Sequence, residues 1–257
     1  MHYIISDVHG CFHTLTKLLE QVRAADEFPQ LVFVGDYVDR GKLNKETVDL
    51  VISLQAQGAV CLRGNHDDIF DYLLNGHCYS RIKDWVAGLA TKENVLRWWC
   101  QNGFIPTLDS YQINDGSRAD VIAQLLDKVP HEHKTFFLNL ELFWENDTHF
   151  ACHGMMRHNE ELPRDLKFVK SDRFEEVLWG RYNSSPVGGL TITDAVLWDK
   201  IGVFGHSPTW LYGSPVPIKW DKIRLIDTGV FRADGYLTSY CCDTDDWILQ
   251  ATDSRDI

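Results

Sequence analysis

The chain has 257 residues, of which 44% are hydrophobic, and this is enough to bury a sizeable core in one large domain. Lys and Arg total 25 against 37 for Asp and Glu, and the net charge of -12 argues against sequence-independent binding to nucleic acid or anionic lipid. No stretch approaches the roughly 18 consecutive apolar residues of a membrane span. The first residues lack the pattern of a secretory signal, and the seven cysteines form no paired motif. We therefore expect a cytoplasmic protein with reduced thiols and with no nucleic-acid or membrane partner.

The first 66 residues alternate between short apolar runs and segments with helical spacing. The runs "HYIIS", "LVFV" and "AVCL" predict three buried strands. Apolar residues at helical spacing between these runs predict two helices, the second over residues 46–58 with Gly58 as its C-cap. The resulting βαβαβ order indicates a mainly parallel sheet that is covered by helices.

The middle of the chain changes character. Residues from about 68 to 140 carry apolar side chains at helical spacing and predict a helical insertion beside the sheet. Its tryptophans 85, 98 and 99 favour core packing, and a ligand-stacking surface is the alternative. His131 and His133 stand two apart in a predicted helix, where they point to different faces, so we expect surface histidines and no metal site. From about residue 141 short strand-like runs return, some of them expected to pair antiparallel. The simplest organisation is one domain over residues 1–257 with the insertion at about 68–140.

Polar side chains follow each apolar run at the point where the predicted strand ends. Ligands gather at the carboxyl ends of strands in open α/β sheets, so these side chains are expected to meet in space. Carboxylate, imidazole and amide donors together suit Mn²⁺, Fe²⁺ or Zn²⁺, and the absence of cysteine from the set disfavours a structural zinc site. The candidate ligands are Asp7, His9, Asp36, Asn65, His153 and His206.

Six candidate ligands are too many for one ion that keeps an open coordination position. They fit two divalent ions if one carboxylate bridges, and Asp36 is the natural bridge because its strand lies between its partners. Each piece alone has an ordinary explanation: a turn or cap at Asp7, an Asp–Arg pair at Asp39 and Arg40, a hydrogen-bonded structural histidine. Five such clusters at successive strand ends favour a metal site that acts on a phosphate-like substrate.

Five motifs in this order resemble those of the phosphoprotein phosphatase (PPP) branch of metallophosphoesterases. They are "SDVHG", "GDYVDRG", "LRGNHD", "CHGM" and "FGHSP". The later stretches "QNGFIPTLDSY", "LWGRY" and "IDTGV" are similar to the small bacterial and phage serine/threonine protein phosphatases of that branch. The resemblance implies a calcineurin-like α/β sandwich, in which two mixed β-sheets are flanked by helices, with a helical insertion.

The resemblance also implies a role for each matching residue. The first metal would be held by Asp7, His9 and Asp36, and the second by Asp36, Asn65, His153 and His206. The phosphate oxygens would be bound by Arg40, Arg63 and Arg181, whose guanidinium forks match that geometry. His66 would be the general acid that protonates the leaving oxygen, and Asp39 would orient its imidazole.

The implied activity is that of a dinuclear metal-dependent phosphatase. A metal-bridging hydroxide would attack phosphate monoesters, above all phosphoserine and phosphothreonine in proteins, with broad activity on small phosphate esters. Manganese is the expected metal, with iron or zinc as alternatives. A dinucleoside polyphosphate hydrolase is the first rival function, and a non-catalytic scaffold with a phosphatase fold is the second.

Four departures from the family pattern are Ser6, Asp67, Met155 and Ser207, none of which removes a proposed ligand. We expect Asp67 and Met155 to bear on the choice of substrate, because dinucleoside tetraphosphatases often carry aspartate at the first of these positions. Asp39 favours the protein-phosphatase branch, because symmetrical tetraphosphatases commonly lack an acid there.

Overall fold

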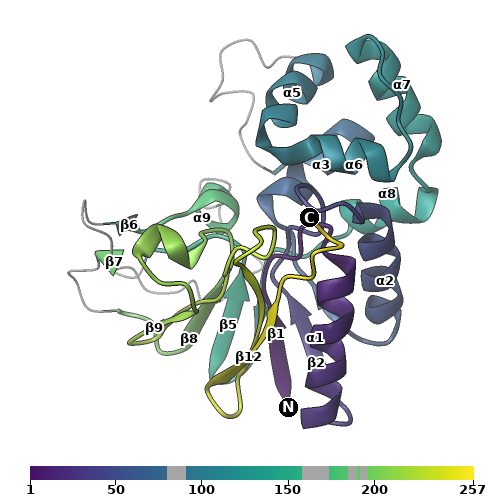
Figure 1. The fold of residues 1–257 in the computed structure, drawn as a ribbon. Coiled ribbons are helices and arrows are strands. Elements are labelled where there is room, and N and C mark those ends of the chain that lie inside the picture. Colours follow the sequence, from purple (N-terminus) through teal and green to yellow (C-terminus); the bar gives the residue numbers. More distant parts are fainter. Residues whose placement is uncertain (80–90, 158–173, 185–189, 192–195) are drawn as a thin grey trace.

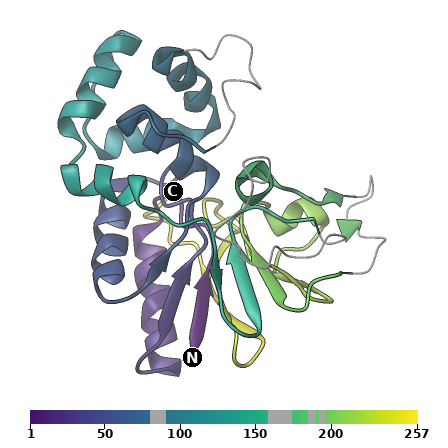
Figure 2. The ribbon, with the colours of Figure 1, turned by 180° about the vertical axis from the view of Figure 1, so that it is seen from behind.

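A computed structural model of the chain describes residues 1–79, 91–157, 174–184, 190–191 and 196–257. Two five-stranded sheets pack face to face, and helices cover the outer face of the first sheet (Figures 1 and 2). The expectation for Trp85 lies outside the described residues. The two mixed sheets confirm the predicted α/β sandwich.

The first sheet contains the three strands predicted at the start of the chain. Its order is β12 (Asp246–Ala251), β11 (Tyr236–Cys241), β1 (His2–Ile5), β2 (Gln30–Phe33) and β3 (Val60–Cys61). Strands β1, β2 and β3 are parallel, as the βαβαβ order requires, and β11 pairs antiparallel with β1. The crossover helices α1 (Phe12–Ala25) and α2 (Asn44–Ala56) bury their apolar stripes in the largest core cluster.

The second sheet is built from the last part of the chain. Its order is β4 (Trp144–Glu145), β5 (His149–Cys152), β8 (Ile201–Phe204), β10 (Ile223–Leu225) and β9 (Ile218–Trp220). Strands β5, β8 and β10 are parallel, whereas β4 and β9 join the edges antiparallel. Apolar residues of both sheets, such as Ile4, Val32 and Val203, form a shared core between them. Nearby lie α9 (Phe174–Trp179), the 3-10 helix η3 (Thr209–Tyr212) and the two-stranded ribbon of β6 (Asn183–Ser184) and β7 (Leu190–Thr191).

Helices fill the described part of the middle region. They are α3 (Asn65–Asn75), α5 (Lys92–Trp99), the π-helix η1 (Cys100–Phe104), α6 (Ile105–Ser110), α7 (Arg118–Lys128) and α8 (His131–Leu138). Their apolar residues join the core cluster of α1 and α2, and Trp99 is buried there at 1% exposure. Among the described residues, no helix combines the length and apolar character that crossing a membrane needs.

The expectation of a surface position is wrong for one of the two paired histidines. His131 is exposed, but His133 is buried at 1% exposure where α8 contacts α2. Its Nδ1 lies 2.8 Å from the Tyr111 hydroxyl and its Nε2 lies 2.8 Å from Asp49 Oδ1. Both ring nitrogens have protein partners, so His133 is a structural residue that ties the insertion to α2.

Candidate metal centre

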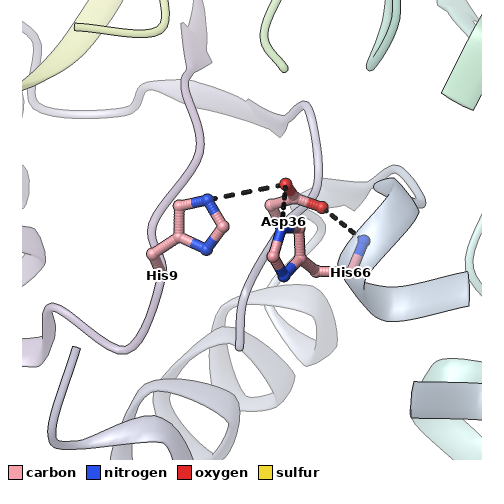
Figure 3. A group of neighbouring side chains, drawn as sticks. All are labelled: His9, Asp36 and His66. Atoms are coloured by element: carbon pink, nitrogen blue, oxygen red, sulfur yellow. Dashed lines mark hydrogen bonds and ion pairs between the residues drawn. The ribbon is translucent and has the colours of Figure 1, made fainter. Parts of the chain in front are cut away.

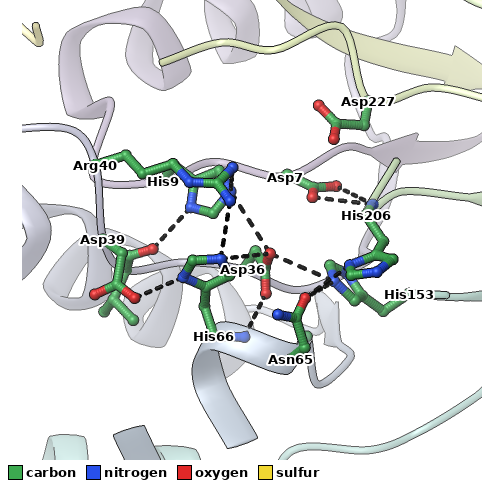
Figure 4. A network of polar contacts seen from close by, with 12 residues as sticks. Asp7, His9, Asp36, Asp39, Arg40, Asn65, His66, His153, His206 and Asp227 are labelled. Atoms are coloured by element: carbon green, nitrogen blue, oxygen red, sulfur yellow. Dashed lines mark hydrogen bonds and ion pairs between the residues drawn. The ribbon is translucent and has the colours of Figure 1, made fainter. Parts of the chain in front are cut away.

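The carboxyl ends of β1, β2, β3, β5 and β8 meet at one edge of the sandwich. Parallel register aligns Ile5 with Phe33 and Cys152 with Phe204, so the residues that follow these strands emerge side by side. The two sheets are joined there, because the His206 backbone N–H donates to both carboxylate oxygens of Asp7 at 3.1 and 3.0 Å. Figure 4 shows the predicted ligands converging on this point.

Asp36 lies at the centre of the group. Its Oδ2 lies 3.5 Å from His9 Nε2, and its Oδ1 accepts the His66 backbone N–H at 2.9 Å (Figure 3). The same Oδ2 lies 3.4 Å from His153 Nε2 (Figure 4). Burial acts to raise the pKa of Asp36, but the positive charge of nearby His153 and its hydrogen bond outweigh burial and lower that pKa well below its ordinary value. Asp36 is therefore ionised, and its Oδ2 faces imidazoles on two sides.

Two glycines allow the chain to approach the carboxylates this closely. A Cβ at position 64 would overlap Asp36 Oδ1, and a Cβ at position 205 would overlap Asp7 Oδ1. Asp36 itself adopts a left-handed backbone conformation with φ 56°, which is uncommon outside glycine. Asp67 supports this turn by accepting backbone N–H bonds from Asp36 at 2.7 Å and Tyr37 at 3.0 Å.

The second predicted metal site is preorganised around Asn65. Its Oδ1 lies 2.9 Å from His153 Nε2 and 2.8 Å from His206 Nδ1. His153 Nδ1 donates to the Val34 carbonyl at 3.0 Å, so in the neutral ring its Nε2 carries a lone pair that faces the lone pairs of Asn65. Two acceptors in this position need a cation between or beside them.

A proton meets that need when no metal is bound. Burial opposes the charged imidazole, but the carboxylates of Asp36 and Asp7 outweigh it and raise the pKa of His153 to about 9. A divalent cation that displaces this proton would find imidazole, amide and carboxylate donors, which suit Mn²⁺, Fe²⁺ or Zn²⁺. The donor set around Asn65 therefore fits a divalent cation.

The first predicted metal site contains the imidazole of His9 and, unexpectedly, that of His66. His9 donates from Nδ1 to the Val38 carbonyl at 2.8 Å, and burial together with the Arg40 charge lowers the pKa of His9 to about 3. Its Nε2 therefore carries a lone pair, which accepts a hydrogen bond from Arg40 at 2.9 Å. Among the described residues, two triads could each hold a metal ion, because the ligand atoms within each triad lie within 4.8 Å of one another. One triad is His9, Asp36 and His66, and the other is Asp36, His153 and His206. Both triads contain Asp36, as a bridging ligand requires. Asp7 lies beside them, with both oxygens accepting from the His206 amide, whereas His66 takes the place in the first triad that was expected for Asp7.

The proposed acid and its carboxylate are in direct contact. His66 Nδ1 lies 2.6 Å from Asp39 Oδ2, and both residues are buried. Burial lowers the pKa of His66 well below its ordinary value, and burial, opposed by hydrogen bonds from Thr107 and Trp99, raises the pKa of Asp39. Burial thus favours an uncharged pair over one with net negative charge. Nδ1 of His66 is thus bound to Asp39, and its Nε2 accepts a hydrogen bond from the Arg40 guanidinium at 3.1 Å.

Two residues that hold Asp39 escaped the sequence analysis. The Trp99 indole donates to Asp39 Oδ2 at 2.7 Å, and the Thr107 hydroxyl donates to Oδ1 at 2.6 Å. They stand 60 and 68 residues from Asp39 along the chain. The stretch that contains Thr107 matched the family pattern, but nothing local in it indicates this contact.

Two of the three predicted phosphate-binding arginines lie at the site. The Arg40 guanidinium lies 2.9 Å from His9 Nε2 and 3.1 Å from His66 Nε2, with its Cζ 4.3 Å from the centre of the Phe231 ring. Arg181 donates to the Ser207 hydroxyl at 2.9 Å and to the His206 carbonyl at 3.1 Å. Both side chains are therefore positioned next to the imidazole cluster.

Arg63 is not at the site, and the expectation that it binds phosphate is corrected. Its side chain is fully buried against α3, where its NH1 lies 2.9 Å from Asp71 Oδ2 and 3.3 Å from Asp68 Oδ1. Its NH2 also donates to the Phe137 carbonyl. The two acids stand three apart on α3 and share one helix face, and this face draws the guanidinium away from the metal ligands.

Replacing Arg63 with methionine should destabilise the fold without weakening phosphate binding. The change leaves two buried carboxylates without their cation, which typically costs about 3–5 kcal/mol of unfolding free energy. Urea denaturation measures this loss, with exposed Arg97→Ala as the control. Unchanged stability together with weaker inhibition by inorganic phosphate would return Arg63 to the predicted role.

The two departures expected to bear on substrate choice lie inside the protein. Asp67 is fully buried and accepts backbone N–H bonds from the turns at Asp36 and Gly64. Met155 is 3% exposed in the core of the second sheet, where its sulfur accepts the Tyr182 N–H at 3.4 Å. The observed contacts of both side chains maintain the fold.

Asp227 is a further acid at this centre that the sequence analysis did not single out. It lies beside Asp7 in Figure 4, is 1% exposed, and accepts the Gly229 N–H at 2.9 Å through Oδ1. Its Oδ2 has no hydrogen-bond partner within the described part of the chain. Burial and the neighbouring Asp227 charge raise the pKa of Asp7 well above its ordinary value. The centre therefore concentrates negative charge that divalent cations would relieve.

Asp227→Asn should change stability in opposite directions with and without metal. In metal-free protein the melting temperature should rise, because a buried repulsion with Asp7 is removed. The affinity for Mn²⁺, measured by calorimetry, should fall by roughly 10-fold, because a supporting anion is lost. A lower metal-free melting temperature with unchanged Mn²⁺ affinity would make Asp227 a purely structural acid.

Comparison with known proteins agrees with this geometry. The family model described as calcineurin-like phosphoesterase matches residues 3–230. The Salmonella typhimurium protein named "Serine/threonine-protein phosphatase 1" is 33% identical over 230 residues, which cover 88% of this chain and 85% of that protein. A Vibrio campbellii protein named "Bis(5'-nucleosyl)-tetraphosphatase, symmetrical" is 35% identical over 112 residues, 42% of this chain and 41% of that protein. The chain thus matches less than half the length of this tetraphosphatase.

A solved structure shares the fold at low sequence identity. It is described as "Crystal structure of a putative diadenosine tetraphosphatase" and has a TM-score of 0.61 at 17% identity, covering 98% of this chain and 94% of that one. With the family match over most of the chain and the imidazole–carboxylate cluster at its strand ends, the chain belongs to the calcineurin-like phosphoesterase family.

Proposed function

We propose that the chain hydrolyses phosphate monoesters with alkoxide leaving groups, phosphoserine and phosphothreonine among them, with the help of two divalent cations. The observation that carries this proposal is the 2.6 Å contact between His66 and Asp39 beside Asp36. An alkoxide is a poor leaving group and needs a proton as its bond to phosphorus breaks, whereas the phosphate leaving group of an anhydride needs none. A buried acid with its own carboxylate is therefore suited to monoesters of alcohols.

Other residues of the site would bind the metal ions and the phosphate group. Manganese ions, our proposed cofactor, would lower the pKa of a bound water and neutralise charge that develops at phosphorus. Asp36 and its imidazole neighbours would hold that pair. Arg40 and Arg181 would bind the non-bridging phosphate oxygens, and the stacking of Arg40 on Phe231 restricts its guanidinium to one orientation.

The proton would leave from His66 Nε2, which accepts a hydrogen bond from Arg40 in this structure and would carry the proton once Arg40 binds the phosphate instead. Its other nitrogen stays on Asp39, so the imidazole keeps one orientation while the proton moves to the leaving oxygen. The chain needs no covalent phosphoenzyme for this reaction, and no cysteine or serine nucleophile enters the proposal.

The comparisons favour a second candidate substrate, a dinucleoside tetraphosphate. Related proteins from Vibrio campbellii and Vibrio parahaemolyticus carry the name symmetrical bis(5'-nucleosyl)-tetraphosphatase, the latter at 43% identity over 112 residues. These matches cover 41% of each relative, whereas the match to the Salmonella phosphatase covers 85% of that protein. The tetraphosphatase relatives and the acid pair thus point to different substrates of the same chemistry.

A side-by-side assay separates the candidates. The Mn²⁺-loaded protein is given a phosphoserine peptide and diadenosine tetraphosphate at matched concentrations, and kcat/KM is measured for each. The proposal predicts the larger kcat/KM on the peptide. A far larger value on the tetraphosphate would establish the second candidate, and a metal-loaded protein inactive on every phosphate compound would favour the non-catalytic scaffold.

A further inference from the structure

The helical insertion contacts the loop that carries Asp39 and Arg40. We call residues 99–107 of the insertion the clamp segment. The Thr107 hydroxyl accepts the Asp39 backbone N–H at 3.0 Å and donates to Asp39 Oδ1 at 2.6 Å. The Gly103 carbonyl accepts the Arg40 N–H at 2.8 Å, and the Trp99 indole donates to Asp39 Oδ2 at 2.7 Å. The clamp segment therefore binds the loop through both backbone and side chain.

The loop needs such external support because its backbone is strained. Asp39 has φ 76° and Arg40 has φ 71°, a left-handed conformation that costs non-glycine residues of order 1–3 kcal/mol each. It persists only where the surroundings impose it. Gly103 has φ 101° at the π-helix, and a Cβ there would overlap the Arg40 side chain, so the two backbones pack directly against each other.

The same contacts fix the direction of His66. Asp39 Oδ2 receives both the Trp99 N–H and His66 Nδ1, at 2.7 and 2.6 Å, while Thr107 occupies Oδ1. Rotation of this carboxylate would break at least one of the three bonds. The Trp99 ring also packs against the His66 ring, with centroids 4.5 Å apart at 61°. The His66 imidazole is thereby held between the Asp39 carboxylate and the Trp99 ring.

We propose that Trp99 and Thr107 are positioning residues for proton delivery, and that the clamp segment makes the site selective for esters with alkoxide leaving groups. This inference rests on the proposed function. The insertion is then a fixed part of the active site, because it supplies the donors that aim Asp39 and, through Asp39, the imidazole. Substrates whose leaving group needs no proton should be insensitive to the Trp99 and Thr107 donors, whereas alcohol esters should depend on them.

The test compares one substrate that needs a proton with one that does not. Thr107→Val removes the hydroxyl with little change of shape, and Thr107→Ser restores it. The matched control is Thr47→Val, because Thr47 is fully buried and its hydroxyl has no hydrogen-bond partner in the described residues. The substrates are a phosphoserine peptide and p-nitrophenyl phosphate, whose phenolate leaves without a proton.

We expect Thr107→Val to lower kcat on the peptide by roughly 10-fold or more and to leave kcat on p-nitrophenyl phosphate within about twofold. Thr107→Ser should recover most of the loss, and Thr47→Val should change neither rate. Bound Mn²⁺ and the melting temperature, measured for each variant, report whether the fold and the metal centre are intact.

Trp99→Phe is an independent test of the inference, because it keeps an aromatic ring against His66 and removes the N–H donor to Asp39. Its control is Trp198→Phe, since Trp198 is 1% exposed and its indole N–H has no partner in the described part of the chain. Trp99→Phe should show the same selective loss on the peptide. Equal losses on both substrates, or none, in folded Thr107→Val or Trp99→Phe would overturn the inference. Wild-type protein inactive on both substrates would instead refute the proposed function.

Discussion

Asp36→Asn should lose divalent cations and phosphatase activity together. Asp36 is common to both ligand triads, so its replacement removes one anionic ligand from each site at once. Loss of a residue that only supports a metal ligand costs about 10–100-fold in metal affinity, and the loss of a shared ligand should exceed that. Elemental analysis after gel filtration counts the ions retained, and an assay on p-nitrophenyl phosphate measures activity.

The control for this variant is Asp109→Asn, an exposed acid on α6 outside the metal centre. It should keep both ions and full activity. An Asp36→Asn protein that still binds two Mn²⁺ ions would contradict the bridging role, whatever its activity.

His66→Asn should keep its metal and lose turnover selectively. If His66 delivers the proton, kcat on a phosphoserine peptide should fall by roughly 10²–10⁴-fold. The loss should be much smaller on diadenosine tetraphosphate, because its leaving phosphate group needs no proton. Steady-state kinetics on both substrates measure the difference.

The same variant tests whether His66 is the general acid or a metal ligand. His66 Nε2 lies 3.9 Å from Asp36 Oδ2 and belongs to a possible ligand triad, so the geometry alone also permits it to hold metal. A His66→Asn protein that loses one of its two ions would make His66 a ligand and remove it from the role of acid. A His66→Asn protein that retains both ions and turns over the peptide as fast as the wild type would exclude His66 both as a metal ligand and as the acid.

The sequence predicts this centre well where local pattern determines position. Apolar runs followed by polar residues place Asp7, Asp36 and Asn65 at the ends of parallel strands, and such ends must meet at one edge of the sheet. His153 and His206 follow neighbouring parallel strands of the second sheet for the same reason. Convergence of these residues needs only the strand order and direction.

Residues whose role depends on distant partners could not be predicted in this way. Arg63 stands one residue before Gly64, yet its direction is set by Asp68 and Asp71 on the face of a helix. Trp99 and Thr107 reach Asp39 from the insertion, where the tryptophan pattern indicates only core packing. Such contacts depend on how the insertion packs, and no spacing in the sequence records that packing.

Substrate choice likewise depends on more than local sequence pattern. The ligand types and the guanidinium forks at the strand ends define phosphoester chemistry, because they match a metal pair and a phosphate group. Substrate choice depends on surfaces around the centre, and the residues expected to reveal it, Asp67 and Met155, are buried in the fold. In the function proposed above, the contact between Asp39 and His66 bears on the leaving group of the substrate.

The position of bound metal tests the central claim most directly. Anomalous diffraction from crystals of the Mn²⁺-loaded protein should show two peaks about 3.5–4 Å apart. Asp36 should lie between them, with His9 at one peak and His153, His206 and Asn65 at the other. A single peak, or two peaks that do not share Asp36, would contradict the account.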